Sequence, residues 1–579
     1  MVSPENPHML GRRLSSVFAV LITLVLLGGV FVSHRASRDA AILPVPDQVT
    51  WAADIAPLIE RECLDCHGED PLAPFTLLSY ENAAERAERI VRATSARRMP
   101  PWLPGGEHGT FAGERILTDR EIELFRAWVE DGAVAGSPTP ETLVADEEEV
   151  WQPGEPDLVV TLPTYPLAAR GHDVYRNLVV EIPVQETRWV EYVELRPGNR
   201  TAVHHARVMV DETSSSRQLD EQDLDPGFDG MELTSNATNP DGHFIGWTPG
   251  KTRLAPLDGM AWRLEPGTDL VVQLHLRTSG EPQEVTAQVE FHFADEPPTR
   301  RPAILVVSSL QIDIPAGATD YAVSNSFTLP VDVDVLSVYP HAHYLGKDLR
   351  ATALLPNGRE IPLIHIPEWD FNWQDDYRFT RPIPLPAGTT IVKEFAFDNS
   401  AENPHNPADP PKRVVYGSNS DDEMADLILQ VLPRNQADRE ELIQAQAWQH
   451  EAEDMAYMAE IEYGRGVTAF DVGDLDQATR HFQESLQYRA DHIGSLVGLA
   501  ELFVRRADAQ SALMIARQGV QMSNRQDARA LAALAMAQAL GGSMGEARAT
   551  ANEAIARARA IGDSDVIHAV DSRVRALAR

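Results

Sequence analysis

Two cysteines constrain this chain more than any other feature. Cys63 and Cys66 are its only cysteines, and they stand in CLDCH, directly before His67. No further thiol is left for a disulfide, so the fold must hold by packing. C-x-x-C-H attaches a c-type haem: the two thiols add to the haem vinyl groups, and the adjacent histidine becomes the proximal iron ligand. The alternative is a chance or redox-active C-x-x-C. The adjacent histidine and the helical patterns on both sides favour one covalent haem c.

An all-α domain is expected around this motif, over residues 46–140. An amphipathic segment, VTWAADIAPLIERE, precedes the motif, and TDREIELFRAWVEDGA follows it with Thr118 and Glu121 spaced as a capping box. The second segment resembles the terminal helix of class I cytochromes c. We expect Met99, in RRMPPW, to be the sixth iron ligand, because methionine/histidine ligation raises a haem potential and suits an electron carrier. The rivals are a buried core methionine at this position and His108 as the ligand.

The middle of the chain carries an ordered set of metal-binding residue types. Imidazole suits copper in either oxidation state, and a thioether favours Cu(I), so the set predicts two copper ions. His341 and His343 would share one face of a strand, since side chains alternate with period two. His204 and His205 are adjacent and would point to opposite faces, so a shared metal there requires a bulge or a strand end. The predicted ligands are His204, His205, His275, His341, His343 and Met424.

The order of these motifs resembles the copper type II, ascorbate-dependent monooxygenases, the family of peptidylglycine alpha-hydroxylating and dopamine beta-monooxygenases. The likeness runs from about Leu158 to Pro433, as VHHARV, VVQLHL, YPHAHYLGK and DDEM in that order. It implies two jelly-roll-like β-sandwiches, here residues 156–298 and 299–435, with a solvent-filled cleft between two coppers. It also implies that His204, His205 and His275 hold an electron-storing copper. His341, His343 and Met424 would then hold the copper that activates dioxygen.

The substrate stays open, because the chain departs from the family where the peptide-processing branch binds its substrate. That branch has an arginine where Tyr339 stands, and an asparagine and a tyrosine at the positions of Asp426 and Ile428. Those family residues are tied to binding a terminal carboxylate. Asp426 would repel a carboxylate if it faced the cleft. The sequence therefore argues against a peptidylglycine substrate and leaves an unidentified small molecule or peptide. We expect the run Asp421 to Glu423 to be solvated, with Met424 turned inward.

The first 45 residues are expected to be a membrane anchor or an export signal. Leu14 to Val32 is an almost unbroken apolar run of nearly the length that spans a bilayer, and no clear cleavage site follows it. An uncleaved anchor is favoured over a cleaved signal. Because haem attachment of this type occurs outside the bacterial cytoplasmic membrane, as the resemblance implies, the bulk of the chain is expected in the periplasm. Either arrangement places the chemistry outside the cytoplasm.

Residues 436–579 are expected to form an array of helical repeats. In chain order the haem domain is followed by the linker 141–155, the two sandwiches and then this array. Ala478, Ala512 and Ala547 recur at a spacing of about 34 residues. The segment resembles tetratricopeptide repeats (TPR), whose concave surfaces usually bind a peptide or a protein. The alternative is a helical cap that stabilises the sandwich or a dimer. Before the repeats, residues 435–464 are expected to form one long helix.

Charge and motif content together bound the function. The net charge of −37, from 87 acidic and 50 basic residues, argues against nucleic acid as a partner. The resemblance predicts an oxidoreductase that hydroxylates a substrate C–H bond with O₂, with electrons relayed by its own haem. The electrons would come from a redox donor protein or a quinol-linked reductant. The alternative is a membrane-anchored haem and copper electron-transfer or scaffold protein without monooxygenase activity.

Overall fold

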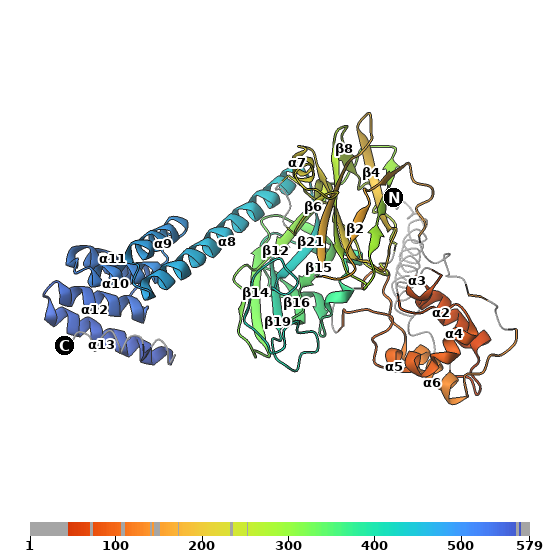
Figure 1. Ribbon diagram of the computed structural model, residues 1–579, viewed down its shortest axis with the longest axis horizontal. Coiled ribbons are helices and arrows are strands. Elements are labelled where there is room, and N and C mark those ends of the chain that lie inside the picture. The colour runs from red at the N-terminus through yellow and green to blue at the C-terminus, as the bar shows by residue number, and fades with distance from the viewer. Residues whose placement is uncertain are drawn as a thin grey trace, which may run out of the picture. The chain divides into compact units, whose positions relative to one another are not determined.

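The computed structural model describes residues 44–69, 73–105, 110–138, 142–143, 151–171, 173–231, 236–251, 253–562 and 567–568 (Figure 1). The predicted anchor, His108 and most of the predicted linker lie outside these ranges. Among the described residues, no helix combines the length and the apolar character that a membrane crossing requires.

The chain divides into two compact units. Unit 1 comprises the described residues of 44–102, 113–152 and 249–255, and unit 2 comprises those of 103–112, 153–248 and 256–568. The two units are not consecutive in sequence. Residues 103–112 lie with unit 2, where Ala112 N donates to Arg378 O at 2.7 Å, and residues 249–255 lie with unit 1. The sequence pattern gave no sign of either exchange, because both segments are short and lack periodicity.

Unit 1 is helical and is built around tryptophan rings. Its elements are η1 (Trp51–Ile55), α2 (Ala56–Glu62), α3 (Leu64–His67), α4 (Tyr80–Glu85), α5 (Ala87–Ser95) and α6 (Asp119–Glu130). Trp51 and Trp128 are fully buried, with ring centroids 6.0 Å apart. The predicted capping box is confirmed: Thr118 and Glu121 satisfy each other's backbone N–H groups at the start of α6.

The first β-sandwich-like part of unit 2 packs two main sheets against each other. One sheet has the order β1-β11-β4-β8, the other β6-β3-β9-β5-β7, and β10-β2 is a separate pair. Along β5, Ala206, Val208 and Val210 enter the core between the sheets, so the intervening residues lie on the outer face. The elements are β1 (Leu158–Thr161), β2 (Tyr165–Leu167), β3 (Val174–Glu181), β4 (Arg188–Pro197), β5 (Val203–Asp211), α7 (Ser215–Asp220), β6 (Phe228–Asp229), η2 (Pro240–Gly242), β7 (Ile245–Trp247), β8 (Trp262–Leu264), β9 (Asp269–Leu276), β10 (Gln283–Val285) and β11 (Ala287–Ala294).

The second β-sandwich-like part repeats this plan. Its sheets have the orders β12-β21-β15-β18 and β14-β19-β16-β17, with β13-β20 as a separate pair. Val338, Leu349, Phe395 and Leu429 are almost completely buried in its core. The elements are β12 (Ala303–Val307), β13 (Asp313–Ile314), β14 (Tyr321–Thr328), β15 (Val333–Ala342), β16 (Gly346–Leu354), β17 (Glu360–Ile366), η3 (Phe371–Trp373), β18 (Tyr377–Leu385), β19 (Thr390–Phe397), β20 (Val414–Val415) and β21 (Ala425–Pro433).

The C-terminal part is an array of antiparallel helices. The expected long helix is confirmed as α8, which packs on β12 and β21 near its start and on α9 near its end (Figure 1). Ala478, Ala512 and Ala547, the predicted repeat positions, are all fully buried. The array therefore has the repeated helix pairs that the period predicts. Its helices are α8 (Gln436–Asp471), α9 (Leu475–Tyr488), α10 (Ile493–Arg505), α11 (Ala509–Met522), α12 (Ala528–Leu540) and α13 (Met544–Ile561).

Candidate metal centres

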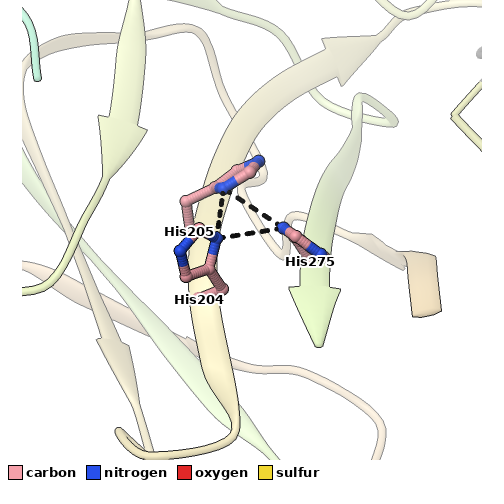
Figure 2. A group of neighbouring side chains, drawn as sticks. All are labelled: His204, His205 and His275. Atoms are coloured by element: carbon pink, nitrogen blue, oxygen red, sulfur yellow. Dashed lines mark hydrogen bonds between the residues drawn. The ribbon is translucent and has the colours of Figure 1, made fainter. Parts of the chain in front are cut away.

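Three predicted ligands converge on the outer face of the first sandwich. His204 and His205 lie on β5, and His275 lies opposite them on β9. The Nδ1 atom of His204 is 3.1 Å from both His205 Nδ1 and His275 Nδ1, and the latter two are 3.4 Å apart. The register of β5 against β9 shifts between Val203 and His205, and this bulge lets adjacent histidines share one side. Figure 2 shows the three rings turned toward one another.

This geometry fits a metal ion better than a hydrogen-bonded cluster. Nitrogens bound to one ion at about 2.0 Å and at tetrahedral angles lie roughly 3.3 Å apart. Asp173 Oδ2 lies 2.9 Å from His275 Nε2. This bond places the proton on Nε2 and leaves the lone pair of Nδ1 facing the other two rings. Tyr175 stacks on His275 with ring centroids 4.3 Å apart, which fixes the plane of that ring.

The electrostatics of the first set keep its imidazoles neutral. Burial lowers the pKa of His204 to about 3 and that of His205 well below the usual 6.5. The pKa of His275 is also lowered by burial, against the raising effect of Asp173. Neutral imidazole is the form that binds a metal.

The second predicted set lies where β15 meets β21. His341 Nδ1 is 2.5 Å from Gln374 Oε1, and His343 Nδ1 is 3.2 Å from Asp422 O. Both contacts direct the proton to Nδ1 and leave Nε2 as the metal-binding atom. His343 Nε2 is buried without a hydrogen-bond partner, as a ligand atom would be. Burial lowers the pKa of His343 to about 3.

Met424 joins this second set by strand register. His341 pairs with Asp426 and Ala342 pairs with Ala425, so continuing the register places Met424 opposite His343. Paired residues of antiparallel strands share a face. A thioether ligand favours copper over the other metals that bind imidazole. The histidine pair and Met424 therefore fit a copper ion.

Glu423 was expected to be solvated, and that expectation was wrong. Its side chain is fully buried. The carboxyl accepts backbone N–H bonds from His343 and from Met424, the latter at 2.9 Å, and from Leu345 at 3.0 Å. Burial raises the pKa of Glu423 to about 8, although the three donors act to lower it. This side chain ties the segment that carries His343 to the one that carries Met424.

The C-x-x-C-H motif lies at α3, where Cys63 directly precedes the helix and His67 ends it. Neither Cys63 nor Cys66 is in a disulfide, and burial raises the pKa of Cys63 to about 12. A protonated thiol of this kind is a poor metal ligand. His67 Nδ1 is 2.9 Å from Phe75 O, which leaves Nε2 for iron. Met99, half-buried in the loop after α5, stays a prediction as the sixth ligand.

Other clusters of polar side chains have structural explanations. Glu462, His481 and Glu484 lie close enough together to hold an ion, but Arg465 and His481 already pair with the buried Glu462. His365 is bonded to Asp348, and His405 is exposed. Sequence reasoning missed Asp173, Gln374 and Glu423, which support the ligands. Only Glu423 had a visible signal, its position directly before Met424.

We expect copper at the first set to remain bound below pH 6.5. A lowered pKa means that the neutral imidazoles persist at pH values where exposed imidazoles would be protonated. Copper content measured after dialysis between about pH 7 and about pH 5 should stay nearly constant for this set. A Met424→Leu variant isolates the first set for the measurement. Loss of half of its copper close to the usual imidazole pKa would contradict the prediction.

Comparisons with known proteins find structural similarity alone, and that similarity is low. No protein-family model matches the chain, and no curated protein matches its sequence. Among solved structures, it is similar to the first TPR of Spaghetti (RPAP3) bound to an HSP90 peptide, with 15% identity and a TM-score of 0.19, over 21% of this chain and 98% of that one. It is also similar to the N-terminal domain of stress-induced protein-1 from C. elegans, with 15% identity and a TM-score of 0.17, over 21% and 96%. A structure of the infectious bursal disease virus Gx strain aligns with 11% identity and a TM-score of 0.16, over 50% and 76%. The chain is multidomain, with β-sandwich-like sheets and a C-terminal helical array that resembles tetratricopeptide repeats.

Proposed function

We propose that this chain is a copper-dependent monooxygenase with its own c-type haem. The observation that carries the proposal is the convergence of three Nδ1 atoms within 3.4 Å on β5 and β9. The second set adds a thioether and two histidines whose Nδ1 atoms are both hydrogen-bonded. An electron carrier has no need for two such sets.

The chemistry supplied by bound copper is one-electron redox change and dioxygen activation. The overall reaction takes a C–H bond, O₂, two electrons and two protons to a C–OH group and water. This chain's residues do the positioning. Asp173 fixes the tautomer of His275, and Gln374 does the same for His341. Glu423 fixes the distance between the two ligand-bearing segments.

The haem domain is the proposed source of the electrons. Bound haem supplies reversible one-electron storage, held by Cys63, Cys66 and His67, with Met99 as the proposed sixth ligand. Phe75 O orients the His67 ring, and the Phe75 ring packs against it with centroids 4.5 Å apart. The substrate is an unidentified small molecule or peptide. Export by the N-terminal segment would place the sandwiches in a bacterial periplasm, anchored or released.

The helical array supports a second proposal, that a protein or peptide binds there. One solved structure to which the chain is similar is described as holding an HSP90 peptide. In this chain a partner at the array would be separate from both histidine sets. The partner would bring either a substrate or an electron donor to the enzyme.

Copper content per haem tests the proposed function. The full chain, matured with both metals and freed of loosely bound ions, should hold two coppers per haem. His275→Ala and Met424→Ala should each remove one, and His405→Ala, an exposed histidine, should remove none. Reduced protein should then consume O₂. Retention of two coppers without O₂ uptake would favour the electron-transfer alternative. Absence of copper would exclude both the monooxygenase and the copper-containing electron-transfer protein.

A further inference from the structure

A phenylalanine ring packs against both histidine sets. Phe371 lies on η3, in the loop that joins β17 to β18, and only 2% of it is exposed. Its ring centroid is 5.5 Å from that of His204 in the first set and 5.7 Å from that of His343 in the second. One ring thus contacts a ligand of each set. The resemblance implies a solvent-filled cleft at this place.

The loop that carries Phe371 is attached to the second set. Trp369 Nε1 donates to His343 O at 3.0 Å, and Gln374 Nε2 donates to Phe371 O at 3.0 Å. The other end of Gln374 is the partner of His341. One residue on each side of the phenylalanine therefore holds a ligand: Trp369 bonds the backbone of His343, and Gln374 bonds the ring of His341.

The same loop is attached to the first set. Arg277 follows His275 by two residues and extends past the end of β9. Its Nη2 atom donates to Asn372 Oδ1 at 2.9 Å and to Tyr344 OH at 3.2 Å. The Tyr344 ring also packs on Phe371, with centroids 4.5 Å apart. Residues of both sandwiches therefore hold the Phe371 ring in place.

We propose that Phe371 is a positioning residue that keeps the two histidine sets apart as separate, dry one-ion sites. The proposal rests on the proposed function. An aromatic ring offers no lone pair that could bridge two ions, and it leaves no polar room for water. Removal of the ring would open a cavity lined on two sides by imidazoles. The two sets could then close on that cavity, which would shorten the distance between the two ions and couple their spins.

Electron paramagnetic resonance of the copper(II)-loaded full chain tests this role. The native protein should show two uncoupled copper(II) spins and one narrow copper–copper distance. Phe371→Ala should lower the integrated copper(II) signal below two spins per chain or shift and broaden that distance. Phe371→Leu keeps an apolar side chain in the gap and should behave as the native protein does. Phe327→Ala, which removes a buried ring from β14, is the matched control for general destabilisation.

The outcomes distinguish failure of the proposed role of Phe371 from failure of the proposed function. If Phe371→Ala holds two coppers and gives an unchanged spectrum, the proposed role of Phe371 is wrong and the proposed function is unaffected. Absence of copper from the native protein overturns the proposed function and the proposed role of Phe371 with it. If Phe371→Ala fails to fold, Phe371→Val takes its place; valine is shorter than leucine and leaves part of the gap open, so a smaller loss of signal is expected. An unchanged spectrum in Phe371→Val then overturns the proposed role.

Discussion

Replacement of Glu423 by alanine is expected to empty the second copper set and leave the first set filled. Three backbone N–H groups, on His343, Leu345 and Met424, lose their acceptor in a buried site. Each orphaned donor costs about 1–3 kcal/mol, so the variant should lose roughly 3–5 kcal/mol of unfolding free energy even after partial relaxation. Copper per haem should fall from two to one, with denaturant unfolding as the second measurement.

Two comparisons sharpen this prediction. Glu423→Gln keeps an oxygen that can accept from His343 and Met424, and it should lose less stability. Asp421→Asn changes an exposed carboxylate in the same run and should retain both coppers. Full retention of copper and stability in the alanine variant would show that the carboxyl holds nothing in place.

The effect of Glu423→Ala on the free energy of unfolding should depend on pH, because the pKa of Glu423 is raised in the folded chain. The Glu423 carboxyl has a pKa of about 8 in the folded chain and about 4.5 unfolded, so between these values the folded chain binds more protons. Its stabilising contribution is fully present below about pH 4.5 and is lost as the pH rises toward 8. The stability difference between native protein and Glu423→Ala should shrink across that window.

The sequence predicted the helix-rich and strand-rich regions, and it predicted that a metal shared by His204 and His205 needs a bulge or a strand end. These follow from local periodicity and from the alternation of side chains on a strand. The placement of Asp173, Gln374 and Phe371 could not be predicted, because each acts on histidines that are far away in sequence. Phe371 reads as an ordinary apolar residue in WDFNWQDDY. Only the folding of the β17–β18 loop between the sandwiches brings it to both sets. The expectation of a solvated Glu423 failed because neighbouring aspartates suggested an exposed acidic run.

Replacement of Phe482 by alanine is expected to loosen the first helix pairs of the array without releasing copper. The Phe482 ring is 1% exposed and lies between α8 and α10, where a Cβ added at Gly466 or Gly498 would come within 2.5 Å of it. Loss of a buried phenylalanine costs about 3–5 kcal/mol. Repeats interact mainly with their neighbours, so the damage should stay within the array. Hydrogen exchange should rise in α8 to α11, while copper per haem stays at two.

This result decides what the helical array does for the rest of the chain. Tyr488→Ala removes an exposed ring from the same helix and should leave hydrogen exchange unchanged. Since α8 also packs on β12 and β21, a structural cap would transmit the loss to the second sandwich. Simultaneous unfolding and release of copper in Phe482→Ala would therefore identify the array as that cap. Retained copper and retained O₂ uptake, with binding of a partner lost, would instead identify it as a docking surface.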